Sequence, residues 1–265
     1  MSESTFKHDL IIHKLDVQVG KDNIRLLDDI SLQFTSAGMH AIVGPNGSGK
    51  TSLLKTICLL HQPTAGEISM KGENIQHWTA ETRAKNIAYL GQFVESHWRL
   101  NALQVVELGL IAAPHLNAAE KQDRLAELIE QFELHDIAEQ TFNTLSGGER
   151  ARILLARSVS AKPTVLLADE PLNGLDLKYQ RKMLETLQAL CKDGMMVIIV
   201  MHDLNQVLKH CKSCALIHNG KLIKQGEVSE VLNIKNIKQY FEVNLHYQVT
   251  DHGKIVLVDS EKEYD

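Results

Sequence analysis

The stretch Gly44-Pro-Asn-Gly-Ser-Gly-Lys-Thr51 decides how this sequence is interpreted. It fits the pattern G-x-x-x-x-G-K-[S/T], it follows the short apolar run 41–43, and apolar residues at helical spacing come after it. A glycine-rich turn between a strand and a helix presents backbone N–H groups to phosphate oxygens, and the helix N-terminus adds positive potential. A turn that binds nothing is the alternative, but it leaves the full match unexplained. The stretch therefore predicts a nucleotide site that contains Gly44, Pro45, Asn46, Gly47, Ser48, Gly49, Lys50, Thr51 and Ser52.

Two of these residues carry further chemistry, together with an acidic pair later in the chain. Lys50 is a mobile cation for the outer phosphates, and the Thr51 hydroxyl can ligate magnesium. The apolar run 165–168 ends in Asp169 and Glu170, where one carboxylate can hold magnesium and the next can act as a general base toward water. Strands that end in solvated acids are common, so only the combination with the phosphate loop predicts nucleotide hydrolysis.

The hydrophobic pattern predicts an α/β protein. Residues 11–19 and 30–34 alternate, with Ile11, Leu15 and Val19 assigned to one stripe, which indicates antiparallel strands with one wet face. Residues 93–149 show helical spacing without a strand signal. The short apolar runs 165–168 and 197–201, separated by a helix, indicate a parallel sheet with covered faces. Residues 245–257 predict a terminal β-hairpin.

Composition limits the partners and the compartment. The net charge of -5 gives no basic excess for nucleic acid, so no nucleic-acid partner is expected. No run approaches the roughly 20 apolar residues of a membrane span, and residues 1–5 lack the features of a secretory signal. We therefore expect a cytosolic chain that reaches a membrane through a partner. Its four cysteines are expected to be thiols, and the pair Cys211 and Cys214 lacks a second metal-ligand pair.

A third motif gives the family resemblance. Ser146-Gly-Gly-Glu149 reads locally as a helix cap, but Leu145–Glu149 as a whole resembles the signature motif of the ABC transporter ATPases. The other motifs of that family follow in order: the phosphate loop as Walker A, Gln92 as the Q-loop glutamine, Val165–Glu170 as Walker B, Asp176 in the D-loop and His202 as the switch histidine.

The resemblance implies a fold and a set of roles. It implies one ABC ATPase domain over 1–240, with a RecA-like P-loop NTPase core and β subdomain (1–92 and 150–240), a helical subdomain (93–149) and a β extension (241–265). It implies ATP and Mg²⁺, with Thr51, Gln92 and Asp169 around the metal and with Glu170, His202 and Gln92 in catalysis. Further residues would complete the ATP site across a homodimer of cassettes: Ser146, Gly148 and Asp176.

Softer matches resemble one branch of the family, the ATPases of iron–siderophore, haem and cobalamin importers. They include 105–115, the segment after His202, and the C-terminal hairpin. This branch implies integral membrane permease subunits, an extracytoplasmic substrate-binding protein, and a peripheral position on the cytoplasmic face of the inner membrane. A permease helix would dock near 92–99, where Phe93 and Trp98 either face the partner or pack in the core.

Two alternatives stay open from the sequence, a cytosolic ABC ATPase without a membrane partner and the motor of an exporter. One departure from the family pattern concerns the base of the nucleotide. Val19 stands where the family has an aromatic residue that stacks on adenine.

Overall fold

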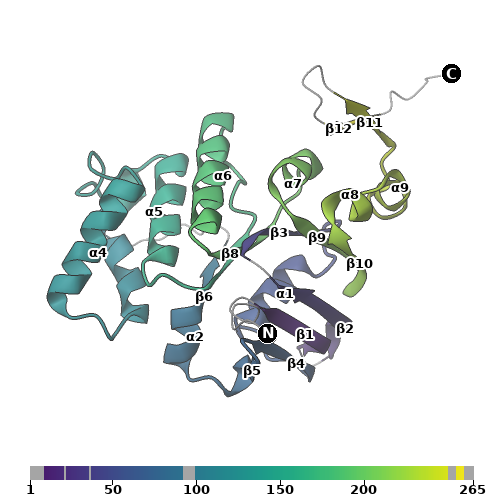
Figure 1. The fold of residues 1–265 in the computed structure, drawn as a ribbon, viewed down its shortest axis with the longest axis horizontal. Coiled ribbons are helices and arrows are strands. Elements are labelled where there is room, and N and C mark those ends of the chain that lie inside the picture. Colours follow the sequence, from purple (N-terminus) through teal and green to yellow (C-terminus); the bar gives the residue numbers. More distant parts are fainter. Residues whose placement is uncertain (1–8, 21, 36, 92–98, 250–254, 260–265) are drawn as a thin grey trace, which may run out of the picture. The chain divides into compact units, whose positions relative to one another are not determined.

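The computed structural model describes residues 9–20, 22–35, 37–91, 99–249 and 255–259, and it divides the chain into two compact units. The first unit combines the described parts of 1–76 and 198–265, and the second is His77–Val197. Gln92, Phe93 and Trp98 lie outside the described residues, so the expectations for them stay predictions. Figure 1 labels the elements.

The first unit contains an antiparallel sheet with the strand order β2-β1-β4-β5. Strand β1 pairs with β2 along one edge and with β4 along the other. This pairing confirms the antiparallel strands that the alternating pattern predicts. The bounds of the four strands are Leu10–Val19 (β1), Ile24–Phe34 (β2), Ala65–Met70 (β4) and Glu73–Asn74 (β5).

The predicted stripe along β1 is wrong in its first half. Ile11 is 39% exposed, whereas its neighbours Leu10 and Ile12 are buried. Lys14 takes the left-handed conformation with φ 47°, and the pairing register shifts between Ile12 and Leu15. A bulge at this point moves the later side chains to the opposite face, so that Leu15 is buried as predicted.

The phosphate loop of the first unit starts from a strand that is buried along its whole length, β3 (Gly38–Val43). It pairs in parallel with β9 (Ser213–His218), which pairs antiparallel with β10 (Lys221–Glu227). The loop leads directly into helix α1 (Lys50–Ile57), whose Leu53, Leu54 and Ile57 are buried. The strand, loop and helix that the sequence predicts are therefore present in this order.

The rest of the first unit is the C-terminal part of the chain. It contains α7 (Leu204–His210), α8 (Val228–Val231), α9 (Ile234–Phe241) and the antiparallel pair of β11 (Leu245–Val249) with β12 (Ile255–Asp259), which confirms the predicted hairpin strands. None of the four cysteines, all of which lie among the described residues, forms a disulfide. Burial raises the pKa of the Cys214 thiol to about 12, so this group stays protonated at neutral pH.

The second unit combines a parallel pair of strands with several helices. Strand β6 (Ile87–Leu90) pairs in parallel with the fully buried β7 (Val165–Asp169). Helices α4, α5 and α6 lie side by side in Figure 1. The helices of this unit are α2 (Ala80–Asn86), α3 (Ala102–Glu107), α4 (Ala118–Gln131), α5 (Gly147–Val159) and α6 (Leu177–Lys192).

Capping and packing explain these helices locally. Asn101, Asn117 and Ser146 each form a reciprocal capping box with the side chain three residues later. Between 93 and 149 the regular elements among the described residues are helical, apart from an isolated bridge between Asn101 and Thr141. The buried strand β8 (Met196–Val200) then leads from the second unit into the first.

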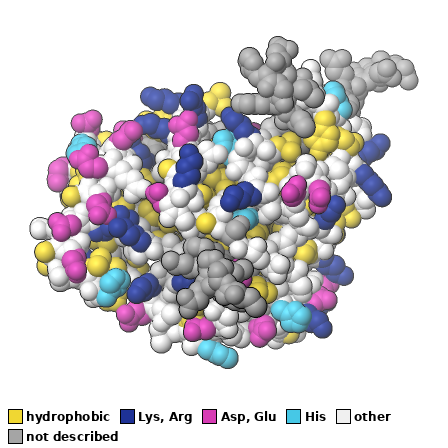
Figure 2. Space-filling model, viewed as in Figure 1, with side chains coloured by type: hydrophobic (Ala, Val, Ile, Leu, Met, Phe, Trp, Pro, Cys, Tyr) yellow, Lys and Arg dark blue, Asp and Glu magenta, His cyan; other side chains and the backbone are white. Residues whose placement is uncertain are grey.

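The described surface is mixed in charge. On the face drawn in Figure 2, acidic and basic side chains are interspersed. No helix among the described residues combines the length and the apolar character that crossing a bilayer requires.

Candidate active site

The phosphate loop has a backbone that requires glycine at two positions. Gly44 has φ 150°, and a Cβ built on it would lie 2.0 Å from the backbone oxygen of Ile217. Gly49, with φ 104°, caps helix α1, and a Cβ there would lie 2.9 Å from the backbone oxygen of Leu26. A side chain at either position would therefore strain the loop. The glycine pattern in the sequence is a direct consequence of this close approach.

Lys50 lies within the loop and is almost completely buried. Its Nζ donates hydrogen bonds to the backbone oxygens of Gly44 at 2.9 Å and Pro45 at 2.8 Å. These two bonds hold the Lys50 side chain within the loop. Ser48 Oγ is a buried polar atom that has no hydrogen-bond partner among the described residues. A cation and an unsatisfied hydroxyl at the N-terminus of a helix suit a phosphate ligand.

The second unit holds the acidic pair at the end of β7. Asp169 is 1% exposed, and its Oδ2 accepts a hydrogen bond of 3.0 Å from the hydroxyl of Tyr89 on the neighbouring strand β6. Tyr89 pairs with Leu167 across the parallel strands, so its side chain follows the same face of the sheet as Asp169. The structure thus gives Asp169 an ordered position, and Tyr89 is a contributor that the sequence analysis missed.

Glu170 adopts an unusual backbone conformation. Its φ is 51°, in the left-handed region that residues other than glycine seldom occupy. Its carboxylate accepts a hydrogen bond from Nδ2 of Asn173, and its backbone oxygen accepts one from the Asn173 amide. A strained residue costs of order 1–3 kcal/mol and persists at functional sites where the surroundings enforce it. The strained backbone and the hydrogen bond from Asn173 support a role for this carboxylate.

The signature residues form the start of helix α5. The Ser146 hydroxyl donates to the Glu149 carboxylate at 2.7 Å, and the Glu149 amide donates back to Ser146 Oγ at 3.4 Å. The bond from the Ser146 hydroxyl and a second one of 2.8 Å from the Ser146 amide hold the pKa of the Glu149 carboxyl below its ordinary value, because they stabilise its ionised form. Gly148 is buried against helix α6. The predicted helix cap is therefore present, and Ser146 and Glu149 form it.

The remaining predicted residues lie at helix starts and strand ends. Asp176 is the N-cap of α6, where its Oδ1 accepts a hydrogen bond of 2.9 Å from the Tyr179 amide. His202 is exposed between β8 and α7, next to the α7 cap Asp203. Each unit therefore holds its own part of the predicted set: the phosphate loop and His202 in the first unit, and the acidic pair, the signature and Asp176 in the second.

The donor set suits magnesium that is shared with a nucleotide. Among the described residues, no three His, Cys, Asp or Glu side chains gather into a metal-binding cluster. Magnesium in such sites is held by one or two carboxylates together with substrate phosphates, rather than by a protein cage. Asp169 in the second unit and Thr51 in the first unit each carry an oxygen atom of the type that such magnesium sites use.

Comparison with known proteins agrees with this assignment. A family model described as ABC transporter matches residues 27–173. The hemin import ATP-binding protein HmuV of Shewanella denitrificans is 32% identical over 94% of this chain and 99% of its own length. The ferric enterobactin transport ATP-binding protein FepC of Escherichia coli K12 is 27% identical, with 84% of each chain covered.

Solved structures share the fold over nearly the whole chain. A putative metal-chelate type ABC transporter in an inward-facing conformation has a chain with a TM-score of 0.80 and 24% identity, which covers 96% of this chain and 98% of its own. An ATP-binding cassette solved as a dimer in a post-hydrolysis state, bound to ADP and Pi, has a TM-score of 0.74 and 27% identity. It covers 83% of this chain and 98% of its own.

Proposed function

The chain is an ATP-hydrolysing subunit that belongs to the ABC transporter family, and we propose that it powers the import of an iron–siderophore, haem or cobalamin-type substrate. The observation that carries the hydrolytic function is the combination of an intact phosphate loop with an ordered acidic pair. The branch is supported by the full-length similarity to a hemin import protein. The sequence match to a ferric enterobactin transport protein points in the same direction.

In this proposal the loop Gly44–Ser52 binds the phosphates of ATP. Lys50 exchanges its carbonyl partners for phosphate oxygens, and the backbone amides at the start of α1 bind the same anion. Glu170 accepts a proton from a water molecule, which attacks the γ-phosphorus so that ADP leaves and inorganic phosphate forms. Asn173 orients the Glu170 carboxylate through the hydrogen bond that joins them. His202 and Gln92 are proposed to contact the γ-phosphate and its metal.

The proposed metal ligands are Thr51, Asp169 and Gln92. When bound, Mg²⁺ would neutralise charge that develops on the phosphate oxygens. The chain's own contribution is the fixed orientation of Asp169, which its hydrogen bond to Tyr89 supports.

We further propose that two copies of the chain act together. Ser146, Gly148 and Asp176 would then complete the ATP site of the partner copy. The similarity to a cassette solved as a dimer with ADP and Pi supports this arrangement. The exposed Leu177, next to Asp176 and 83% accessible in the single chain, is an apolar residue that a second copy would cover.

The permease is proposed to dock on a groove in the second unit. The groove has an apolar lining that includes Ala84, Ile111, Ala112, Pro114 and Ala161. Ile111 is 73% exposed, so it adds an apolar side chain to this groove that a docked partner would cover. With such a partner, the chain would be peripheral on the cytoplasmic face of the inner membrane. An extracytoplasmic substrate-binding protein would join through the permease.

Purification from gently solubilised native membranes tests the import proposal. The tagged chain should retain a permease with many membrane spans, and Ile111→Asp should release it because a buried charge opposes docking. Leu60→Asp is the matched control, since Leu60 is also exposed but lies in the first unit. Recovery of the wild-type chain from the soluble fraction alone, with no membrane partner, would contradict the proposal.

Nucleotide affinity tests the phosphate loop separately. Lys50→Ala should weaken ATP binding strongly, while Lys55→Ala, a change on the last turn of the same helix, should leave it unchanged. Binding of a fluorescent ATP analogue by the purified chain measures both. Equal affinities for the two variants would refute the assigned role of Lys50.

A further inference from the structure

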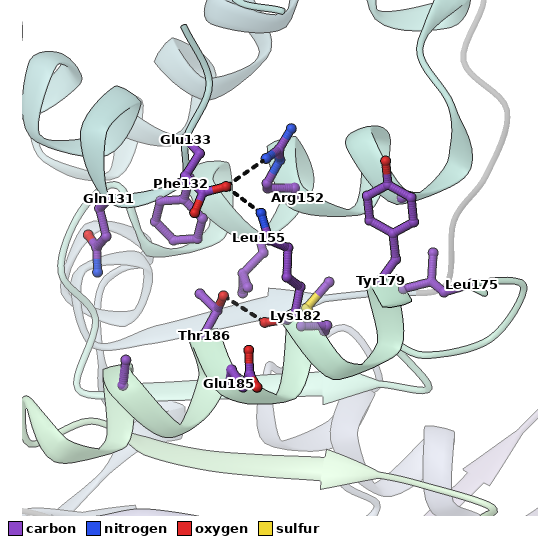
Figure 3. A pocket seen from close by; sticks show the side chains of 13 residues that line it. Gln131, Phe132, Glu133, Arg152, Leu155, Leu175, Tyr179, Lys182, Glu185 and Thr186 are labelled. Carbon is purple, nitrogen blue, oxygen red and sulfur yellow. Dashed lines mark hydrogen bonds and ion pairs between the residues drawn. The ribbon is translucent and has the colours of Figure 1, made fainter. Parts of the chain in front are cut away.

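The first turn of α6 contacts the signature motif through Tyr179. A Cβ built on Gly148 would lie 2.2 Å from Tyr179 Cγ and 2.4 and 2.5 Å from two further ring carbons. The ring therefore fills the space that any side chain at position 148 would need. Figure 3 shows Tyr179 at the start of α6, beside Leu175. Tyr179, Gly148 and Leu175 also line the same cavity of about 250 Å³.

The same helical turn holds the segment that precedes α6. Nε2 of Gln180 donates hydrogen bonds to the backbone oxygens of Leu175 at 3.0 Å and Leu172 at 3.4 Å. The amide of Tyr179 donates to the cap residue Asp176. The turn over 171–175 is therefore tied to α6 by two neighbouring residues.

The two contacted segments are also close to each other. A Cβ built on Gly147, at the start of α5, would lie 4.0 Å from the backbone oxygen of Gly174. The start of the signature helix and the turn before α6 thus approach within van der Waals contact. The Tyr179 ring packs on Gly148 of the signature helix, and Gln180 holds the backbone of the turn at Leu172 and Leu175.

We propose that Tyr179 and Gln180 are positioning residues that fix the signature glycines and the Asp176 segment as one unit for ATP hydrolysis. The inference rests on the proposed function, in which both segments act on the nucleotide of a partner copy. A small displacement of groups that surround a reacting phosphate costs rate, because the productive geometry is narrow. Neither side chain needs to touch ATP for this effect.

Steady-state kinetics of the purified full chain test the proposal. Tyr179→Ala and Gln180→Ala should each lower kcat by about tenfold or more. The affinity of the phosphate loop for a fluorescent ATP analogue should stay within about twofold, because the loop lies in the other unit. Tyr179→Phe keeps the ring and should restore the wild-type kcat. Arg181→Ala is the matched control on the same turn, since Arg181 pairs only with the exposed Glu185 among the described residues.

A double-mutant cycle tests the contact itself. Gly148→Ala should lower the melting temperature of the wild-type chain, because its Cβ meets the Tyr179 ring. In the Tyr179→Ala background the same change should have a much smaller effect, because the space is free. Equal effects in both backgrounds would overturn the proposed packing.

The outcomes separate the inference from the function on which it rests. A wild-type chain without ATPase activity would refute the proposed function. An active wild-type chain, together with folded Tyr179→Ala and Gln180→Ala variants at the wild-type kcat, would refute the positioning role alone. If Tyr179→Ala does not fold, Gln180→Ala decides the question, because it removes hydrogen bonds without opening a cavity beside Gly148.

Discussion

Removal of the Tyr89 hydroxyl is the perturbation whose effect the structure defines most closely. In Tyr89→Phe the ring stays, while Asp169 loses a hydrogen bond of 3.0 Å. Asp169 is 1% exposed, so bulk water cannot replace the lost donor. A hydrogen bond to a charged group contributes about 1.5–3 kcal/mol, and we expect a loss of this size in the free energy of unfolding. For a chain of this length the melting temperature should fall by roughly 3–12 °C.

Calorimetry on the protein without nucleotide measures this effect. Tyr179→Phe is the matched control, because the Tyr179 hydroxyl makes no hydrogen bond among the described residues. We also expect Tyr89→Phe to lower ATPase activity at limiting Mg²⁺, since the carboxylate is less well oriented. If Tyr89→Phe and Tyr179→Phe melt within about 1 °C of each other, Tyr89 does not support Asp169 and the reasoning is refuted.

Three further changes have defined outcomes. Gly44→Ala should lower the free energy of unfolding by about 2 kcal/mol or more, because the new Cβ would lie 2.0 Å from a backbone oxygen. Gly47→Ala should lower the free energy of unfolding by less, because no atom lies within 4 Å of its Cβ. Chemical denaturation of the two variants measures the difference. The pKa of Glu149 is lowered, so its ionised form stabilises the folded chain. The stability advantage of wild type over Glu149→Gln should therefore be full above the ordinary pKa of 4.5 and should disappear as pH falls through the lowered pKa. A difference in stability that does not change with pH would contradict this. Val19→Tyr should tighten ATP binding about 2- to 10-fold, because the tyrosine ring would stack on adenine, while the affinity for tripolyphosphate stays unchanged. Equal gains in affinity for both ligands would mean that adenine is not involved.

The sequence predicted those parts of the site that depend on local chemistry. The phosphate loop needs glycines wherever its backbone has positive φ, so its pattern is visible in the chain itself. The buried strand before Asp169 and the cap at Ser146 also involve only neighbouring residues. These motifs were therefore predictable without any knowledge of the tertiary structure.

Contacts between distant residues were not predictable in the same way. Tyr89 reaches Asp169 across two strands that are 80 positions apart. Tyr179 packs on Gly148 from another helix, and a lone tyrosine in a helix carries no signal of its partner. The bulge at Lys14 likewise reverses the face of β1 without a glycine to indicate it. In each case the sequence shows a residue type, and only the packing shows its role.

The measurement that tests the central claim most directly is ATP hydrolysis by the purified wild-type chain compared with Glu170→Gln. We predict that the wild-type chain releases phosphate from ATP. The Glu170→Gln variant should bind ATP, fail to hydrolyse it, and accumulate as a dimer that light scattering detects. Asp193→Asn, a change at an exposed residue at the end of α6, serves as the control for the loss of one negative charge. Hydrolysis by Glu170→Gln at the wild-type rate would contradict the account.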